Sequence, residues 1–226
     1  MLLFVAFFTL HASLFTLMAQ EDPEYRMEVG AGIGTSTYLG DFNGNLLKNI
    51  QPMGSLVAKY RMNPRMSMGV LMSFGKLKGS AADVSTWYPV HQEPPYTFSY
   101  QLTDVGLRYE YNFWAYGTGR EYRGARRIAP FLTGGMGVTY VNAHGTVLTL
   151  NIMLGAGVKY KVADRLNLTA EWNMHFSGND NLDGAVDPYG IKSTGIFKNT
   201  DCYSMLRLAL TYDIWAKCKT CNNDRD

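Results

Sequence analysis

The sequence predicts an all-β protein, an eight-stranded antiparallel transmembrane β-barrel of the outer-membrane type with long extracellular loops and short periplasmic turns. Three observations indicate this class. Apolar residues recur at every second position, the strands are roughly twice the usual length of about five or six residues, and Tyr and Trp lie near strand ends. The 226-residue chain suits one domain. Its mean hydropathy of -0.14 fits a barrel, in which polar lumen residues dilute the apolar ones.

The stretch from Leu148 to Phe176 shows the alternation most clearly. Apolar residues occupy every second position up to Tyr160, and the pattern resumes at Leu166 after a break at Val162–Arg165. A period of two is typical of strands, so this stretch is predicted to be a long antiparallel hairpin. The alternation alone also fits a soluble sandwich with its apolar face inward. Strand length, aromatic placement and an export signal favour the membrane barrel.

The first twenty residues are predicted to be a secretory signal peptide. An apolar run from Leu2 to Met18 ends before the polar Gln20, and the segment has no basic start. A membrane-anchor helix is the alternative, but polar residues such as His11 interrupt the apolar run. The predicted organisation is a signal peptide at 1–20, a barrel at 21–215 and a periplasmic tail with two cysteines at 216–226.

The same alternation places the other strands. Strands are expected at about 25–39, 55–62, 65–76, 97–113, 128–141, 148–161, 166–176 and 202–214. An even number puts both termini on one side of the membrane, the periplasmic side. The connections at 63–64, 114–127 and 162–165 then lie in the periplasm, and those at 40–52, 78–95, 142–146 and 177–200 are extracellular.

The inward-facing parity of these strands carries charges of both signs. Eight strands enclose an interior just wide enough for side chains to fill, and charges held there must pair or form hydrogen bonds. We therefore expect a salt-bridged plug rather than an open pore. The predicted lumen ion network consists of Arg26, Glu28, Lys59, Arg61, Asp104, Arg108, Glu110, Lys159, Glu171, Arg207 and Asp213.

His175 and Ser177 are two residues apart on a predicted strand, as are the His and Ser of eight-stranded outer-membrane lipid A deacylases. In those enzymes the pair faces the lipid, whereas the parity here turns His175 toward the lumen. A serine nucleophile also needs a base and an orienting acid, and Glu171 is the only nearby candidate on the same face. We expect no catalytic residues and interpret His175 as a polar lumen residue near the extracellular rim.

Cys218 and Cys221 lie in the C-terminal tail. A zinc site needs four ligands, which the tail does not supply, and a thioredoxin-like motif needs a βαβ setting. A local disulfide or a free thiol pair is therefore expected. Cys202 is too distant to join them, because the strand between spans roughly 40 Å at about 3.3 Å per residue, against a Cα reach of about 7 Å.

Two charged segments lie outside the strands. The spacing of Asp180, Asp183 and Asp187 does not match an EF-hand loop, so a solvated loop is favoured over a calcium site. A basic turn is a candidate surface for a periplasmic partner or for lipid headgroups, with an ordinary positive turn as the alternative. Its residues are Arg120, Arg123, Arg126 and Arg127. No cofactor, metal ion, nucleic acid or small-molecule substrate is expected.

Several short motifs, taken in order, resemble a known family, the PorG-type outer-membrane barrels of the type IX secretion system. The similarity is collinear and covers nearly the whole mature chain. The motifs are Glu24-Tyr25-Arg26 with Tyr38-Leu39-Gly40-Asp41, then Tyr60-Arg61-Met62-Asn63-Pro64-Arg65, Tyr109-Glu110-Tyr111-Asn112-Phe113, Pro130-Phe131 ahead of Gly134 to Tyr140, and Glu171-Trp172 followed by Asp180 and Asp183.

The resemblance implies a non-enzymatic scaffold in the outer membrane of a Gram-negative cell. Such a component is in contact with outer-membrane lipid and anchors the periplasmic ring of the secretion and gliding machinery, through a ring lipoprotein and its partner subunit, rather than conducting cargo. The alternative is a stand-alone barrel for adhesion or envelope integrity that acts through the loops at 78–95 and 177–200.

Overall fold

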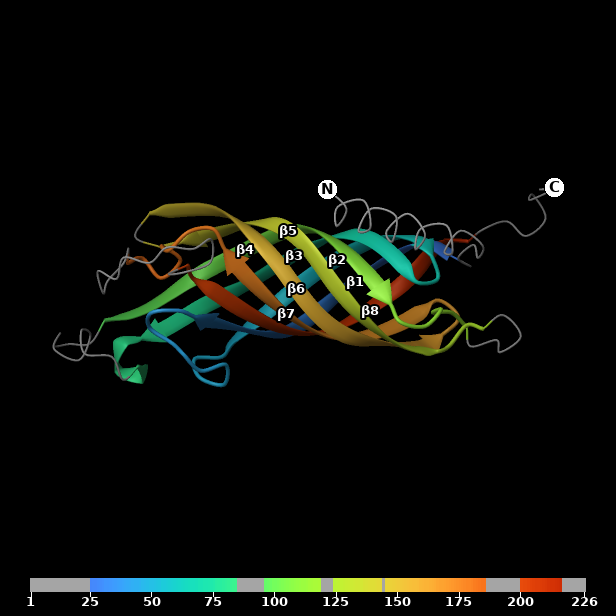
Figure 1. Ribbon diagram of the computed structural model, residues 1–226, viewed down its shortest axis with the longest axis horizontal. Coiled ribbons are helices and arrows are strands. Elements are labelled where there is room, and N and C mark those ends of the chain that lie inside the picture. The colour runs from blue at the N-terminus through green and yellow to red at the C-terminus, as the bar shows by residue number, and fades with distance from the viewer. Residues whose placement is uncertain (1–24, 85–95, 119–123, 144, 186–199, 217–226) are drawn as a thin grey trace, which may run out of the picture.

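The computed structural model describes residues 25–84, 96–118, 124–143, 145–185 and 200–216. These residues form one closed antiparallel barrel, in which each strand pairs with its sequence neighbours and β1 also pairs with β8 (Figure 1). The fold class predicted from the alternation is confirmed. The strands are β1 (Tyr25–Leu39), β2 (Gln51–Asn63), β3 (Met66–Ser80), β4 (Thr97–Asn112), β5 (Ile128–Asn142), β6 (Thr146–Ala163), β7 (Leu166–Ser177) and β8 (Cys202–Ala216).

The strands extend further at the extracellular end than the sequence predicts. β2 begins at Gln51 because its first residues pair with the end of β1, and Gln51 lies opposite Ser36. β3 continues to Ser80, opposite Thr97 of β4, and a short 3-10 helix, η1 (Ala81–Asp83), follows it. In these segments the apolar residues Met53 and Leu77 point into the barrel instead of outward, so the outward-facing apolar pattern that marks the membrane-spanning part of each strand has already stopped there.

The two ends of the barrel differ in their connections. At the right-hand end of Figure 1, β2 turns into β3 through Pro64 and Arg65 and β6 into β7 through Asp164 and Arg165, and the connection between β4 and β5 is the longer one there. Long connections follow β1, β3 and β7 at the left-hand end. The side-chain oxygen of Asn63 accepts hydrogen bonds from the backbone N–H groups of Arg65 and Met66, both at 2.8 Å, which closes the turn between β2 and β3. Short turns lie on the periplasmic side of outer-membrane barrels, so the right-hand end faces the periplasm.

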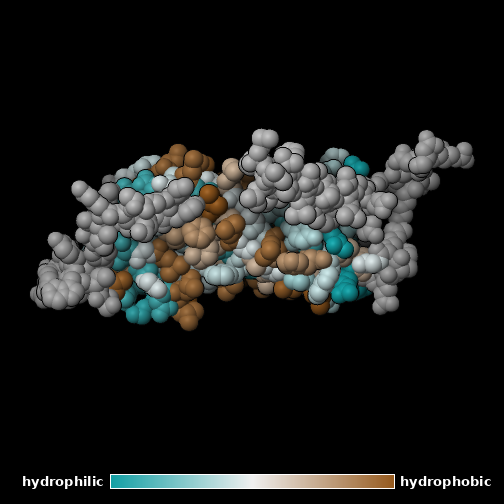
Figure 2. All heavy atoms as spheres, in the orientation of Figure 1, coloured by the Kyte–Doolittle hydropathy of each residue, from teal (hydrophilic) through white to brown (hydrophobic). Residues whose placement is uncertain are grey.

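Side chains alternate between the lumen and the exterior along every strand. On β4, Val105 and Leu107 are exposed, whereas Asp104 and Arg108 are buried. Figure 2 shows hydrophobic residues gathered mainly over the middle of the visible face and hydrophilic ones toward both ends. An inverted pattern of this kind, with an apolar outside and a polar inside, matches a barrel whose exterior contacts lipid.

Exposed aromatic side chains form a band near the periplasmic strand ends. Tyr and Trp prefer the boundary between membrane and water, because they carry an apolar ring with a polar group. The band therefore marks the periplasmic edge of the lipid-facing belt. Its members include Tyr60, Tyr109, Phe113, Tyr160 and Tyr212.

Among the described residues, no helix is long and apolar enough to cross a lipid bilayer.

Glycines on the inward parity make room for the backbone and side chains of the neighbouring strands. A methyl group at Gly157 would lie 2.5 Å from the Ala170 carbonyl oxygen and 2.6 Å from the Phe131 ring. A methyl group at Gly155 would lie 2.6 Å from the Trp172 carbonyl oxygen. Such contacts are too close for any larger residue, so the lumen has no free space for a side chain at these two positions.

A hydrophobic core occupies the extracellular end of the barrel interior. Phe98 packs edge-on against Tyr38 with ring centroids 5.0 Å apart, and Phe42 packs against Tyr96 at 4.9 Å. Leu182, from the connection after β7, is fully buried among these residues. We call this core, together with the loop residues that cover it, the extracellular cap. Its buried members are Tyr38, Phe42, Met53, Leu77, Ala81, Phe98, Leu102, Val141, Val147, Leu182, Tyr203 and Met205.

Candidate functional site

The middle of the lumen holds two carboxylates between two lysines. Lys59 Nζ lies 3.1 Å from Glu28 Oε1 and 3.3 Å from Glu110 Oε2. Lys159 pairs with Glu110 and lies 4.0 Å from Glu28 Oε2. Thr211 also donates a hydrogen bond of 2.5 Å to Glu28. All of these side chains are almost completely buried, so each charge has lost its contact with water. The opposite charges and hydrogen bonds offset this desolvation cost.

On the extracellular side of this group, the Glu171 carboxylate accepts hydrogen bonds from two arginines. Arg108 forms a two-pronged contact, with Nη1 at 3.1 Å from Oε2 and Nη2 at 2.5 Å from Oε1. Arg207 pairs with the same carboxylate from β8. Arg108 also lies 3.6 Å from Glu110, which joins this group to the lysine group. The planar fork of arginine suits such bidentate binding of a carboxylate.

On the periplasmic side, Asp213 is the centre of a third group. Arg61 Nη2 lies 2.9 Å from Asp213 and 2.9 Å from Glu28, so it connects this group to the middle of the lumen. Lys161 Nζ lies 2.6 Å from Asp213, and the Asn167 amide donates to the same carboxylate at 2.8 Å. We call the three joined groups the lumen network.

Tyr116 covers the periplasmic end of the lumen network. It belongs to the connection between β4 and β5, is buried, and donates a hydrogen bond of 2.8 Å to Asn167. Its ring centroid lies 5.6 Å from the Arg61 guanidinium carbon and 5.5 Å from Lys159 Nζ, distances at which a cation is attracted to the ring face. Burial raises the pKa of the Tyr116 hydroxyl, and Glu28 adds to this effect. The hydroxyl therefore stays a neutral donor.

A fourth polar group separates the lumen network from the extracellular cap. The Tyr203 hydroxyl donates to Asp104 Oδ2 at 2.8 Å, and Asn151 donates to the same oxygen at 2.5 Å. The His175 ring stacks on Tyr203 with centroids 4.5 Å apart, and its Nδ1 lies 3.8 Å from Asp104 Oδ1. His175 is fully buried, and neither of its ring nitrogens has a hydrogen-bond partner among the described residues.

Two carboxylates in the extracellular cap share one tyrosine hydroxyl. Tyr38 Oη lies 2.7 Å from Asp183 Oδ2 and 2.5 Å from Asp201 Oδ1. Asp201 also accepts from the Leu182 backbone N–H at 2.8 Å, which fixes the loop to the barrel. A methyl group at Gly40 would lie 2.2 Å from the Tyr38 hydroxyl, so this close arrangement requires glycine there.

The two carboxylates of the cap also influence each other's protonation. Burial raises the pKa of Asp201 to about 8, and the neighbouring Asp183 adds to the rise. Burial raises the pKa of Asp183 as well, with a contribution from Asp180. Near neutral pH one proton is therefore retained between the pair, which avoids two unpaired charges side by side.

The structure places the predicted lumen residues as follows. The lumen network unites Glu28, Lys59, Arg61, Arg108, Glu110, Lys159, Glu171, Arg207 and Asp213. Asp104 is buried but lies apart from the network, with Tyr203 and Asn151. Arg26 does not join it: this side chain is half-buried and has no ion-pair partner among the described residues. Met27 pairs with Tyr60 across β1 and β2, so the preceding residue, Arg26, lies opposite Arg61 near the end of the barrel. The two side chains carry the same charge.

Sequence reasoning missed several members of the site. Lys161 has the inward parity of Lys159, so the alternation was a sufficient signal for it. Asn167 also has the inward parity of its strand, so the alternation could have identified it as well. Tyr116 lies outside any alternating segment, and its place in the lumen depends on how its connection folds back. Nothing in the local sequence indicates that Tyr38 would meet two aspartates more than a hundred residues away.

The candidate chemistry at His175 and Ser177 also lies inside the barrel. Ser177 is buried, and its hydroxyl donates to Thr149 at 3.4 Å rather than to a histidine. Glu171, predicted as the only nearby candidate acid on the same face, is not the acid that His175 contacts. Asp104 lies across the barrel from β7 and is the carboxylate in contact with His175, which a same-strand search does not find.

The solvated loop predicted for the aspartates after β7 is wrong for Asp183. Asp183 is buried and bound to Tyr38, because its loop packs into the cap. The described residues contain no group of three or more His, Cys, Asp or Glu side chains that could hold a metal ion. Asp187 lies outside the described residues, as do the predicted signal peptide at 1–20, Arg120, Arg123, Cys218 and Cys221.

The described part of the basic turn is exposed at the periplasmic end. The Arg126 guanidinium carbon lies 4.7 Å above the Trp114 ring, and Arg127 Nε donates to the Thr118 carbonyl at 3.1 Å. At the other end, Cys202 is half-buried and is a free thiol. The turn therefore presents cations to the periplasm, on the connection that also carries Tyr116.

A closed barrel with an apolar exterior, an interior filled by paired charges and a packed extracellular cap defines an integral β-barrel protein of an outer membrane. Within that class, the chain belongs to the DUF6089 family, described as a domain of unknown function, whose model matches residues 4–223. A search of curated proteins found no match.

Solved structures with a similar arrangement include bacterial outer-membrane proteins. Neisserial surface protein A is 14% identical, with 83% of this chain and 97% of that chain covered and a TM-score of 0.49. OprG from Pseudomonas aeruginosa is 8% identical, with 87% and 99% covered and a TM-score of 0.47. The N-terminal barrel of OprF from the same organism is 15% identical, with 84% and 98% covered and a TM-score of 0.44.

Proposed function

We propose that this barrel is a non-enzymatic scaffold of the type IX secretion and gliding machinery, which anchors the periplasmic ring at the outer membrane. The observation that carries the proposal is the filled lumen. Paired charges occupy its middle, Tyr116 covers its periplasmic end, and the cap covers its extracellular end. A barrel without a passage acts through its outer surfaces.

The resemblance to PorG-type barrels supplies the particular machinery. Residues that carry the resemblance lie at structurally demanding places. Tyr38 and Gly40 build the cap, and Glu171 holds two arginines in the lumen network. On this proposal the ring lipoprotein and its partner subunit bind the periplasmic end, where the exposed Arg126 and Arg127 lie.

Site-specific crosslinking in cells tests the proposal. A photo-crosslinking residue at Arg126 should capture the ring lipoprotein or its partner, while the same residue at Leu47, exposed at the opposite end, should not. A deletion strain should lose secretion through this system. Capture of no ring subunit, together with intact secretion in the deletion strain, would reject the proposal.

A stand-alone barrel for adhesion or envelope integrity is the second candidate. The cap favours it, because Leu182, Asp183 and Tyr96 hold the extracellular connections in a compact arrangement. Deleting residues 186–199 separates the two candidates. The deletion should abolish adhesion if the second is right and leave secretion unchanged if the first is right.

A further inference from the structure

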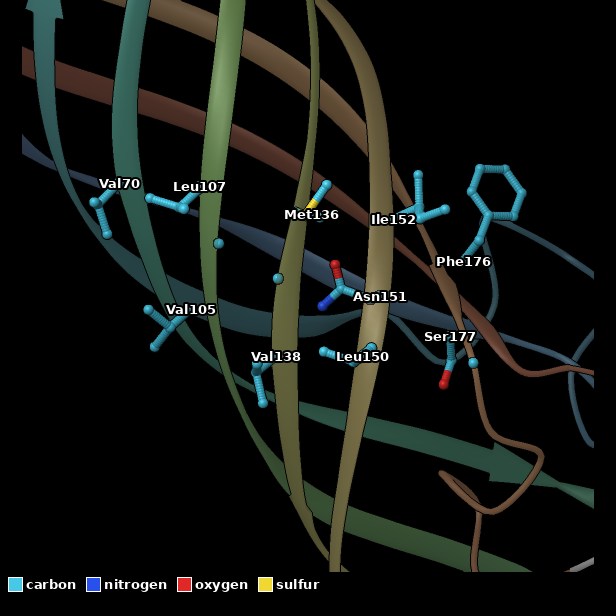
Figure 3. Close-up of a pocket in the computed structure, with 13 residues that line it drawn as sticks. Val70, Val105, Leu107, Met136, Val138, Leu150, Asn151, Ile152, Phe176 and Ser177 are labelled. Carbon is cyan, nitrogen blue, oxygen red and sulfur yellow. The ribbon is translucent and has the colours of Figure 1, made fainter.

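An apolar hollow lies on the exterior of the barrel, in the half nearer the extracellular end. It measures about 690 Å³ and extends from β3 to β7. Figure 3 shows the side chains around it. Gly106 and Gly137 also line the hollow, but they have the inward-facing parity, so its exterior walls are the outward-facing side chains of their neighbours. Five strands spaced about 4.8 Å apart make it roughly 19 Å wide. Its apolar lining includes Val105, Leu107, Met136, Val138, Leu150 and Ile152.

A second hollow of mixed polarity adjoins it toward the extracellular rim. This hollow measures about 410 Å³, and its lining combines Lys76, Gln101 and Thr103 with apolar residues such as Phe74. Thr103 and Val105 are two residues apart on the same face of β4, so the two hollows form one continuous stripe on the exterior. Going from the membrane toward the outside, the stripe becomes more polar and gains the cation of Lys76.

The cations at the polar end have no acidic partners in the described part of the chain. Lys76 and Lys78 are exposed on the exterior face of β3. The nearby carboxylate of Asp83 pairs with a third cation, Lys48, at 3.6 Å. The rim beside the hollow therefore carries an excess of positive charge at the level of lipid headgroups.

We propose that this stripe binds one phosphorylated, multiply acylated lipid of the outer leaflet, of the lipid A class. Its phosphates lie at Lys76 and Lys78, and its acyl chains lie in the apolar hollow. Lys76 is six residues from Val70, which lines the hollow, a span of about 20 Å along β3 that suits a headgroup with chains below it. The width of the hollow accommodates more than one chain.

The headgroup provides most of the selectivity. An acyl chain gains little by leaving other lipid tails for an apolar wall, because both surroundings are equally apolar. The phosphates contribute more binding free energy than the acyl chains, because each Lys near a membrane surface attracts anionic lipid. The hollow contributes shape, since a lipid with several chains fills a broad depression without leaving voids.

Native mass spectrometry of the full-length protein in detergent micelles tests the site, with bis-phosphorylated and dephosphorylated lipid A as probes. The wild type should retain one molecule of the bis-phosphorylated form and at least about tenfold less of the dephosphorylated form. The Lys76→Glu/Lys78→Glu variant should lose the preference, and Lys76→Ala/Lys78→Ala should weaken it. Arg65→Glu, an exposed charge change at the periplasmic end, should leave it unchanged.

The hollow is tested by filling it. Val105→Phe/Val138→Phe should reduce retention of the bis-phosphorylated lipid several-fold, while Leu208→Phe, an enlargement elsewhere on the lipid-facing belt, should not. Equal retention of both probes by the wild type, equal retention by the lysine variants and Arg65→Glu, or equally tight retention of a single phosphoglycerolipid would overturn the proposal.

Discussion

Removing the negative charge of Glu171 should strongly destabilise the barrel. Glu171 accepts two bonds from Arg108 and pairs with Arg207, and all three side chains are buried. Glu171→Gln keeps the shape but leaves two buried guanidinium groups with one fewer carboxylate. Arg108 keeps a contact of 3.6 Å to Glu110, whereas Arg207 has no other ion-pair partner in the described residues. Breaking a buried pair from one side typically costs about 3–5 kcal/mol, and we expect a loss in that range.

The assay is urea unfolding of the protein reconstituted in lipid vesicles, followed by tryptophan fluorescence. The matched control is Asp83→Asn, which breaks the surface pair with Lys48 and should cost less than about 1 kcal/mol. Adding Arg207→Met to Glu171→Gln removes the unpaired cation and should recover about 1–3 kcal/mol. If Glu171→Gln lowers the free energy of unfolding no more than Asp83→Asn does, the buried charges do not stabilise one another and the reasoning fails.

Three further predictions concern the cap, the lumen walls and His175. The pKa of Asp201 is raised to about 8 by burial, so its contribution to folding stability is complete below its unfolded pKa of about 3.9 and is lost as pH rises through about 8. Wild-type stability should therefore fall between pH 5 and pH 9, and Asp201→Asn should flatten this fall in urea unfolding. Gly155→Ala should destabilise the barrel by about 1–3 kcal/mol, whereas Gly54→Ala, with open space around it, should cost far less; equal heat stability of the two on electrophoresis would contradict a filled lumen. His175→Ala should leave secretion unchanged in a complementation assay, and a complete loss in a variant that still folds would indicate chemistry at this residue.

The alternation of the sequence predicts the fold and the residues that face the lumen. Each strand has a period of two, so a single correct assignment of one face gives the orientation of every residue on it. This is why buried charges such as Lys59 and Glu110 could be selected from the sequence. Strand length and the apolar face then indicate a barrel, because the lipid-facing residues need no second sheet to cover them.

The partners of those charges could not be predicted. Contacts across a barrel depend on register and shear, which parity does not determine. Asp104 has the same inward parity as Arg108, yet it contacts His175 and Tyr203 rather than an arginine. The cap was missed for another reason. Asp183 lies in a polar, glycine-containing segment that reads as a solvated loop, and only tertiary packing buries it against Tyr38.

Single-channel recording in a planar lipid bilayer tests most directly whether the lumen is closed. With the lumen network and both covers in place, the reconstituted wild type should show no steady conductance on the scale of a general porin. A steady, open, porin-sized current from folded protein would contradict the closed lumen and, with it, the assignment of function to the outer surfaces of the barrel.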